Sequence, residues 1–238
     1  MARDFSRRSA EAELMDADDT PYETFRGCLR DLAQVNVVTL AHGPTLAFLE
    51  RLRKAGRLDL GRPVGIVDAG AGYGDMLRAV GRWAARRNVP VRLTGVDLNP
   101  WSAKAAAEID PASPIRWLTG DVFAYDEPCD LVVSSLFTHH LTDDQLVRFL
   151  TWMERTAAVG WFVNDLHRHP FPFYGFRLLA AAMRWHPFVR HDGPVSIARA
   201  FSAADWRSLI DRAGLSPAGV KVRWRFPFRL CVARLKPR

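Results

Sequence analysis

Cysteine is scarce in this chain of 238 residues. The three cysteines, Cys28, Cys129 and Cys231, are widely spaced and form no C-x-x-C pair. This number and spacing exclude a disulfide framework and a zinc knuckle and favour a reducing compartment. Long apolar runs are also missing, since none reaches the roughly 18 residues of a membrane-spanning helix. The first residues carry acids and lack the apolar core of a signal peptide, so we expect a cytoplasmic protein without a membrane span.

Acidic residues are missing from the C-terminal segment 221–238, which contains seven basic residues. This segment accounts for the net charge of +7, because the first 220 positions contain 26 basic and 26 acidic residues. Basic and apolar residues alternate from Lys221 to Phe226, which places the positive charge on one face of a strand. We interpret this segment as a sheet edge protected against aggregation. The alternative is a docking surface for an anionic partner such as an acyl carrier, a membrane surface or RNA.

Apolar residues, in contrast, are plentiful. They make up 48% of the chain, which also contains eight tryptophans, so the sequence can bury enough apolar surface to offset the entropy lost on ordering. The length fits one core with appendages better than two full enzyme domains. Residues 1–19 are polar with little periodicity, which predicts a mobile N-terminal arm. Residues 20–62 contain two helical patterns and are predicted to form an N-terminal helical cap.

Short β-rich segments alternate with amphipathic helical segments from residue 63 onward. This alternation predicts a three-layer α/β core over 63–238, in which helices cover both faces of a mostly parallel sheet. Capping-box patterns at Thr20 with Glu23 and at Thr142 with Gln145 predict the starts of two helices. The aromatic segment 166–200 is longer than a crossover needs and predicts a lid-like insertion. The predicted strands cover 64–68, 91–97, 115–118, 131–134 and 161–165, followed by an antiparallel hairpin over 218–226 and 228–235.

A glycine-rich turn, D-A-G-A-G-Y-G over 68–74, follows the first predicted strand and begins a helix. Unpaired backbone N–H groups lie at such a position, and glycine lets a ligand approach them closely. A dinucleotide fingerprint would require glycine at position 75, but the chain has Asp75, a poor neighbour for a pyrophosphate. The turn therefore favours a ligand without phosphate groups.

Acidic residues end three consecutive predicted strands, at Asp68, Asp97 and Asp121. The carboxyl ends of parallel strands meet at one edge of the sheet, where such folds bind their ligands. Asp97 is placed to accept hydrogen bonds from ribose hydroxyls, and Asp121 from the amino group of adenine. Each acid alone is also typical of an ordinary turn or cap. Together they outline a site for a nucleoside with a cationic substituent.

The motifs D-A-G-A-G-Y-G over 68–74, V-D-L-N-P over 96–100 and T-G-D-V-F over 119–123 resemble those of class I S-adenosylmethionine-dependent methyltransferases. The resemblance covers about residues 63–165. It implies a Rossmann-like seven-stranded sheet with an antiparallel C-terminal hairpin, and S-adenosylmethionine as the cofactor, converted to S-adenosylhomocysteine. Residues 13–16 and 164–168 are similar to those of bacterial polyketide-associated methyltransferases. The resemblance implies cofactor contacts from Asp68, Gly70, Gly72, Tyr73, Asp97, Leu98, Asp121, Val122 and Ser134.

Histidines follow two of the predicted strands and are candidates for catalysis. A phenol or enol acceptor reacts faster once deprotonated, and histidine has a suitable proton affinity. His139 and His140 follow the fourth strand, and His167 follows the fifth beside Asp165, which could orient a histidine. Their structural alternative is an ordinary role in loop packing. The predicted substrate contacts are Asp165, Phe173, Tyr174 and Arg199, although aromatic residues at such spacing are often core.

The sequence thus predicts a methyltransferase that acts on a hydroxyl of a small aromatic or polyketide-type metabolite of secondary metabolism. The alternative within the class is a C-methyltransferase of a quinone-like or enol substrate. From other classes, an NAD-dependent oxidoreductase and a non-catalytic RNA- or protein-binding module stay open. No metal is predicted, because Asp165 and Asn164 alone do not make a magnesium site. Nucleic acid is disfavoured as a substrate, and a homodimer is left open.

Overall fold

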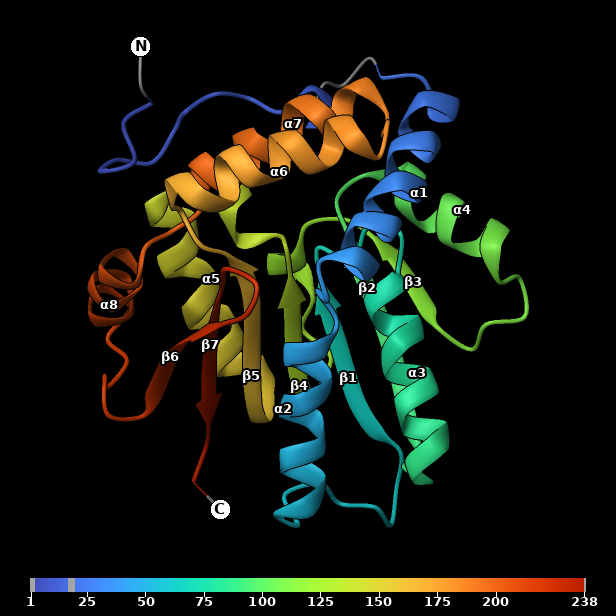
Figure 1. Ribbon diagram of the computed structural model, residues 1–238. Coiled ribbons are helices and arrows are strands. Elements are labelled where there is room, and N and C mark those ends of the chain that lie inside the picture. The colour runs from blue at the N-terminus through green and yellow to red at the C-terminus, as the bar shows by residue number, and fades with distance from the viewer. Residues whose placement is uncertain (1–2, 17–19, 238) are drawn as a thin grey trace.

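The computed structural model describes residues 3–16 and 20–237, and its centre is a seven-stranded sheet (Figure 1). The strand order is β3-β2-β1-β4-β5-β7-β6. Strands β1 to β5 pair in parallel, whereas β7 is antiparallel to both β5 and β6. This architecture confirms the predicted fold class. The strands are β1 Val64–Ala69, β2 Val91–Asp97, β3 Arg116–Thr119, β4 Cys129–Ser135, β5 Ala157–Leu166, β6 Val220–Arg225 and β7 Arg229–Leu235.

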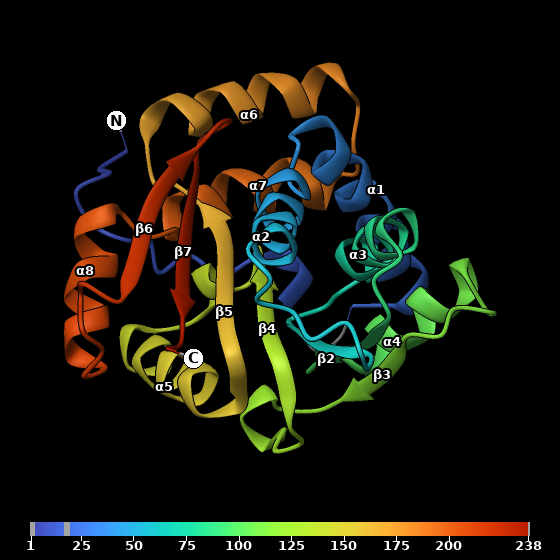
Figure 2. The ribbon, with the colours of Figure 1, turned by 90° about the horizontal axis from the view of Figure 1, so that it is seen from below.

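Helices cover both faces of the sheet and create two separate cores (Figures 1 and 2). Every residue of β1 is buried, as expected for a strand covered on both sides. One core packs α2 (Gly43–Lys54) and α3 (Asp75–Arg87) against one face. The other packs α5 (Asp143–Thr156) and α8 (Ala203–Arg212) against the opposite face. Helix α4 (Pro100–Ile109) lies against β2 and β3.

Three helices lie above the carboxyl ends of the parallel strands (Figure 1). They are α1 (Tyr22–Val38) from the predicted cap and α6 (Pro170–Ala182) and α7 (Pro187–Arg199) from the predicted lid. A shared apolar cluster joins α1 to α6 and α7 through Cys28, Ala180 and Val189. The cap and the lid therefore cover the ligand edge of the sheet together.

The N-terminal arm lies along α7 and reaches the loop after β4. The amide of Ser9 donates to the carbonyl of Ala198, and the amide of Leu14, which begins the short 3-10 helix η1 (Leu14–Asp16), donates to the carboxylate of Asp192 at 2.8 Å. The guanidinium of Arg8 donates to the carbonyls of Leu141 and His139, at 2.8 and 3.2 Å. The described part of the predicted mobile arm thus connects lid and sheet edge.

One of the two predicted capping boxes forms. Thr142 accepts from the amide of Gln145, whose side chain accepts from the amide of Thr142, at the start of α5. The prediction for Thr20 is wrong, because the N-cap of α1 is Pro21 and no side chain caps this helix. Among the described residues, no single helix is long and apolar enough to cross a bilayer, although α1 and α2, which meet at a 62° bend, pass that test when taken as a pair.

Candidate active site

The glycine-rich turn between β1 and α3 contains three glycines with positive φ, namely Gly70, Gly72 and Gly74. A Cβ at Gly70 would lie 2.4 Å from the ring of Phe137, and one at Gly74 would lie 2.1 Å from the ring of Trp117. These two glycines are therefore required by packing within the protein. A Cβ at Gly72 would meet nothing within 4 Å, so Gly72 is the glycine whose backbone faces open space and can be approached by a ligand.

Asp97, at the end of β2, contacts this turn directly. Its Oδ2 accepts from the amide of Gly72 at 2.7 Å, and its Oδ1 accepts from the amide of Asn99 and the hydroxyl of Ser102. A carboxylate offers about four acceptor positions, so one remains for a ribose hydroxyl while these three bonds persist. A second hydroxyl would replace one of the three. The two features that the sequence predicted to meet are thus adjacent.

Asp68, at the end of β1, is a buried carboxyl group with one oxygen that has no partner in the described part of the chain. It is 2% exposed, and its Oδ1 has no hydrogen-bond partner among the described residues. Burial, followed by the neighbouring carboxylates of Asp75 and Asp97, raises its pKa well above the ordinary value. Such a group is costly unless a ligand compensates it. A cationic ligand group would do so, which fits the ammonium and sulfonium of S-adenosylmethionine.

The next two strands provide three more predicted cofactor residues. Asp121 follows β3 and accepts from the amide of Phe123 at 3.0 Å, so it caps the short 3-10 helix η2 (Val122–Ala124). Val122 is buried in this turn, whereas the side chain of Leu98 is 75% exposed. The Asp121 residue is exposed. It lies at the same edge of the sheet as Asp97, because β2 and β3 are parallel and Asp97 pairs with Thr119.

Two predicted cofactor residues have contacts within the fold. The hydroxyl of Ser134 donates to the carbonyl of Ala69 at 2.9 Å and links β4 to β1. The ring of Tyr73 lies beside the guanidinium of Arg78 at 5.3 Å and packs in the cluster below α1. Neither of these contacts involves Asp97, the predicted ribose-binding residue. Ser134 therefore acts here as a link between strands.

His139 lies on a 3-10 helix, η3 (Thr138–His140), directly after β4. It is 3% exposed, and its Nδ1 is 2.7 Å from Oδ1 of Asp165 on β5. Oδ2 of Asp165 accepts from the amide of His139 and from the hydroxyl of Thr138. Burial alone would raise the pKa of Asp165, but the attraction of His139 and these hydrogen bonds lower it to about 2. Asp165 is therefore ionised and holds the Nδ1 proton, which leaves Nε2 as the reactive nitrogen.

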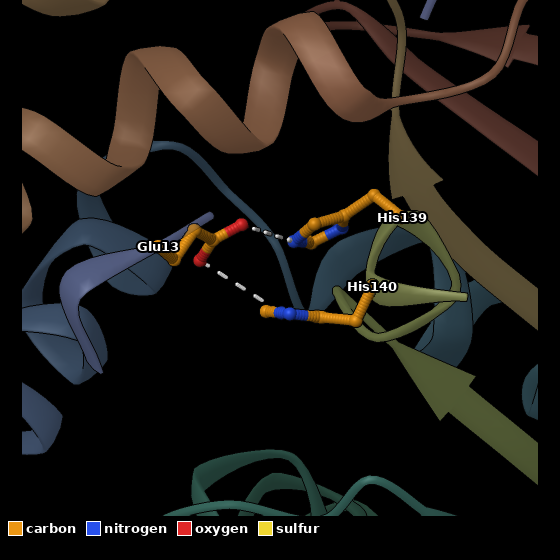
Figure 3. Close-up of side chains that lie close together, drawn as sticks. All are labelled: Glu13, His139 and His140. Atoms are coloured by element: carbon orange, nitrogen blue, oxygen red, sulfur yellow. Dashed lines mark ion pairs between the residues drawn. The ribbon is translucent and has the colours of Figure 1, made fainter. Parts of the chain in front are cut away.

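Glu13, from the N-terminal arm, faces both histidines of η3 (Figure 3). Its Oε1 is 3.8 Å from Nε2 of His139, and its Oε2 is 3.9 Å from Nε2 of His140. Glu13 is 8% exposed, and its Oε1 has no hydrogen-bond partner among the described residues. Nη1 of Arg199 is 3.8 Å from the same oxygen. Sequence reasoning missed Glu13 as a site residue, because no local pattern indicates a contact across more than 120 positions.

The cluster of Glu13, His139 and His140 has the donor atoms of a metal site, since one ligand atom from each lies within 4.8 Å of the others. Its geometry does not favour one. Ligands about 2.1 Å from a tetrahedral zinc ion lie about 3.4 Å apart, which is shorter than both measured separations. The cationic Arg199 beside Glu13 also opposes a metal ion. Separations of 3.8 and 3.9 Å instead leave room for a polar atom of a ligand between Glu13 and the histidines.

His167 lies after β5 without a carboxylate partner among the described residues. Its amide donates to the carbonyl of Phe228, and its Nδ1 is buried without a hydrogen-bond partner in the part of the chain that the structure describes. Burial, followed by the electrostatic effects of His169 and Arg168, lowers its pKa. The carboxylate of Asp165, two residues before His167 in the sequence, orients His139 instead.

The remaining predicted substrate residues lie in different environments. Arg199 is at the cluster, where it donates to the carbonyl of His140 at 3.2 Å. Phe173 is 5% exposed and packs in a core with Ile197 of α7. Tyr174 is 44% exposed and lines a separate outer hollow between α6 and α7. The structure thus brings Arg199 to the histidines and does not bring Tyr174 there.

Comparisons with known proteins agree with this geometry. Residues 66–160 match the family model of a methyltransferase domain, whereas no curated protein matches the chain. Magnesium protoporphyrin IX methyltransferase from Synechocystis PCC 6803, solved with bound S-adenosylhomocysteine, is 16% identical with a TM-score of 0.54, over 83% of this chain and 84% of that one. The methyltransferase domain of the citrinin polyketide synthase is 17% identical with a TM-score of 0.61, over 82% of this chain and 52% of that one.

A third similar structure is a plantazolicin methyltransferase in complex with a triazolic substrate analogue and S-adenosylhomocysteine. It is 12% identical with a TM-score of 0.59, over 94% of this chain and 88% of that one. At these identities the structural likeness concerns the fold. The family match places a methyltransferase domain over residues 66–160, with S-adenosylmethionine as its cofactor. The predicted cofactor is thereby confirmed.

Proposed function

We propose that this protein methylates a hydroxyl group of a small aromatic or polyketide-type metabolite, with His139 as the general base. The observation that carries the proposal is the buried contact of 2.7 Å between His139 Nδ1 and Asp165 Oδ1. It fixes the tautomer and aims Nε2 at the space in front of Glu13. An acceptor hydroxyl fits in this space with its oxygen about 2.8 Å from Nε2, to which it donates its single proton.

Residues of this chain bind the cofactor, orient the reacting groups and deprotonate the acceptor hydroxyl. Gly72 and Asp97 hold the nucleoside, and Asp68 compensates the cationic part of the cofactor. When bound, S-adenosylmethionine supplies the methyl group for an in-line displacement. Nε2 of His139 accepts the proton of the acceptor hydroxyl, and the ionised Asp165 stabilises the imidazolium that results. Asp165 is therefore a positioning residue in this proposal, and the lid formed by α6 and α7 excludes water from the reaction.

Carbon methylation of an enol or a quinone-like ring is the second candidate, because the same base would serve it. The names of the structural neighbours mention different molecules, namely magnesium protoporphyrin IX, the citrinin polyketide and a triazolic desmethyl analogue. NMR analysis of the product distinguishes a methyl ether from a methylated carbon. We keep the cytoplasm as the expected compartment and a homodimer as an open possibility.

The test is turnover by single-histidine variants on a panel of phenols and polyketide-type enols. We expect His139→Gln to lower kcat by about a hundredfold, because a positioned general base contributes about 10² or more. His140→Gln and His167→Gln are matched comparisons, for which smaller losses are expected. The Kd for S-adenosylhomocysteine, measured by calorimetry, should be unchanged in all three. If His139→Gln lowers kcat less than tenfold, His139 is not the base.

Calorimetry also separates the alternatives from other classes. The proposal expects binding of S-adenosylhomocysteine and no binding of NAD by the unmodified protein. Binding of NAD in preference to S-adenosylhomocysteine would support an oxidoreductase. Tight, sequence-selective binding of RNA at moderate salt would support a binding module, because weak phosphate contacts are lost as salt rises.

A further inference from the structure

An open cavity of about 480 Å³ lies between α2 and the β6–β7 hairpin. We refer to it as the hairpin groove. Its apolar lining includes Phe48 and Leu52 from α2, Phe162 from β5 and Ala233 from β7. Its volume is in the range of specific binding sites. None of the residues that line it belongs to the candidate active site, so an occupant would leave that site accessible.

The walls of the hairpin groove are basic. Arg51 and Arg57 contribute from α2 and the residues after it, and Lys221, Arg223 and Arg225 contribute from β6. No acidic residue is among the described residues that line the groove. Arg51 and Lys221 have exposed positions, so their charges face solvent. The groove thus combines an apolar floor with positive charge on both sides.

The sheet register explains this combination. Lys221 lies opposite Ala233 and Arg223 lies opposite Cys231, so the charged side chains share one face with the apolar floor. On the other face, Trp206 and Ile210 of α8 cover the same strands. On the groove face, α2 lies against β5, and no helix of the described chain covers β6 and β7 (Figure 2). This face lacks a counterpart to α8.

The cations of the groove also repel one another. Burial, then the positive charges of Arg225 and Arg223, lowers the pKa of Arg51. Arg51 on α2 and the two arginines on β6 therefore face each other across the groove, and no acid of the described segments lines the space between them. A concave site with unbalanced charge of one sign attracts a partner of the opposite sign.

We propose that the hairpin groove binds an acidic amphipathic helix of a partner protein. The cations lie on both walls and along the length of the groove, instead of converging on one point as they would around a single anionic head group. Such a distribution matches acidic residues on both sides of a helix. The apolar stripe of that helix would cover Ala55, Ala233 and Leu235, apolar groove residues that this chain leaves at least partly exposed, as α8 covers the opposite face.

Two other anionic occupants fit less well. A single-stranded nucleic acid needs aromatic ring faces on which its bases stack, but Phe48 and Phe162 stack on each other at 4.6 Å and are each 3% exposed. Trp224 is exposed but alternates with Arg223 and so lies on the opposite face. A membrane surface requires apolar groups that protrude, whereas the apolar floor here is recessed between two basic walls.

The test measures fluorescence anisotropy of labelled, designed helical peptides of about 18 residues. One peptide has a leucine stripe flanked by glutamates, and its matched control has lysines instead. We expect the acidic peptide alone to bind, more weakly as salt rises. Lys221→Glu with Arg223→Glu should lower its affinity at least about tenfold. The control pair, Arg82→Glu with Arg86→Glu, makes the same charge change on the exposed side of α3 and should have no such effect.

A third variant, Ala233→Phe, fills the floor without changing charge and should also weaken binding, while thermal unfolding reports whether each variant folds. Equal binding of acidic and basic peptides, or equal loss in both charge-reversal pairs, would overturn the proposal. So would tighter groove-dependent binding of a uridine oligonucleotide or of phosphatidylglycerol vesicles than of the acidic peptide. Because the groove and the candidate active site share no lining residue, methyl transfer by these variants tests the proposed function separately.

Discussion

Asp68 shows how one side chain can reveal the charge of a ligand. A carboxyl group that is 2% exposed, with one oxygen unpartnered and two other carboxylates nearby, destabilises the fold when it ionises. The sequence indicated an acid at the end of β1, but the same pattern is typical of a turn. The packing leaves Oδ1 of Asp68 buried without a hydrogen-bond partner among the described residues. This feature distinguishes a binding residue for a cation from an ordinary cap.

Asp68→Asn should therefore stabilise the protein without cofactor and weaken cofactor binding. Because the folded-state pKa of Asp68 is raised, its contribution to stability is present below the unfolded value and is lost as pH rises through the folded value. The Asn variant cannot ionise, so its melting temperature at neutral pH should exceed that of the unmodified protein. Scanning calorimetry checks the first expectation.

The binding of S-adenosylmethionine should also depend on pH through the same group. A cationic ligand favours the ionised carboxylate, so affinity should rise with pH and binding should release protons. Titration calorimetry in two buffers of different ionisation enthalpy measures that release. A proton release that persists unchanged in Asp68→Asn would show that another group is responsible.

At the level of a single structural element, the glycines of the turn between β1 and α3 have different roles. The sequence predicted one role for its glycines, namely close approach of a ligand. The structure divides them, because Phe137 packs on Gly70 and Trp117 packs on Gly74, whereas Gly72 faces open space. Trp117 belongs to β3 and Phe137 follows β4, so spacing along the chain cannot show which glycine serves which purpose.

Gly70→Ala should consequently destabilise the fold more than Gly72→Ala. Both substitutions place a Cβ at positive φ, which costs about 1 kcal/mol, but only the first also forces the ring of Phe137 to move. Gly72→Ala should instead weaken binding of S-adenosylhomocysteine. Urea unfolding and calorimetry measure the two effects. Equal losses of stability in both variants would contradict the division of roles.

At the scale of the whole molecule, the N-terminal arm completes the candidate site. Glu13 reaches His139 and His140 because the amides of Leu14 and Met15 donate to the buried carboxylate of Asp192 on α7, at 2.8 and 3.0 Å. The arm, the lid and the loop after β4 thus meet at one place. A segment without periodicity offers no signal of such contacts, and the sequence predicted a mobile arm.

Asp192→Ala should release the arm from the lid. We expect faster cleavage by trypsin at Arg7 and Arg8. We also expect Asp192→Ala and Glu13→Gln to cause comparable losses of turnover, because each substitution removes the Glu13 carboxylate from His139. Cofactor binding should be retained, since Asp97 and Gly72 lie in the sheet edge. Limited proteolysis and kinetic assays measure these effects. An arm that stays equally resistant in Asp192→Ala would show that other contacts hold it.

The sequence by itself determined the layered sheet and the acids at its carboxyl edge. Both depend on short-range regularities, namely the alternation of strand and helix patterns and the residues that directly follow each strand. It could not determine that Asp165 holds His139 instead of its sequence neighbour His167, that Glu13 faces both histidines, or that the basic hairpin walls an apolar groove. Those contacts join residues far apart in the chain, and only the packing of helices and strands in three dimensions decides which of them meet.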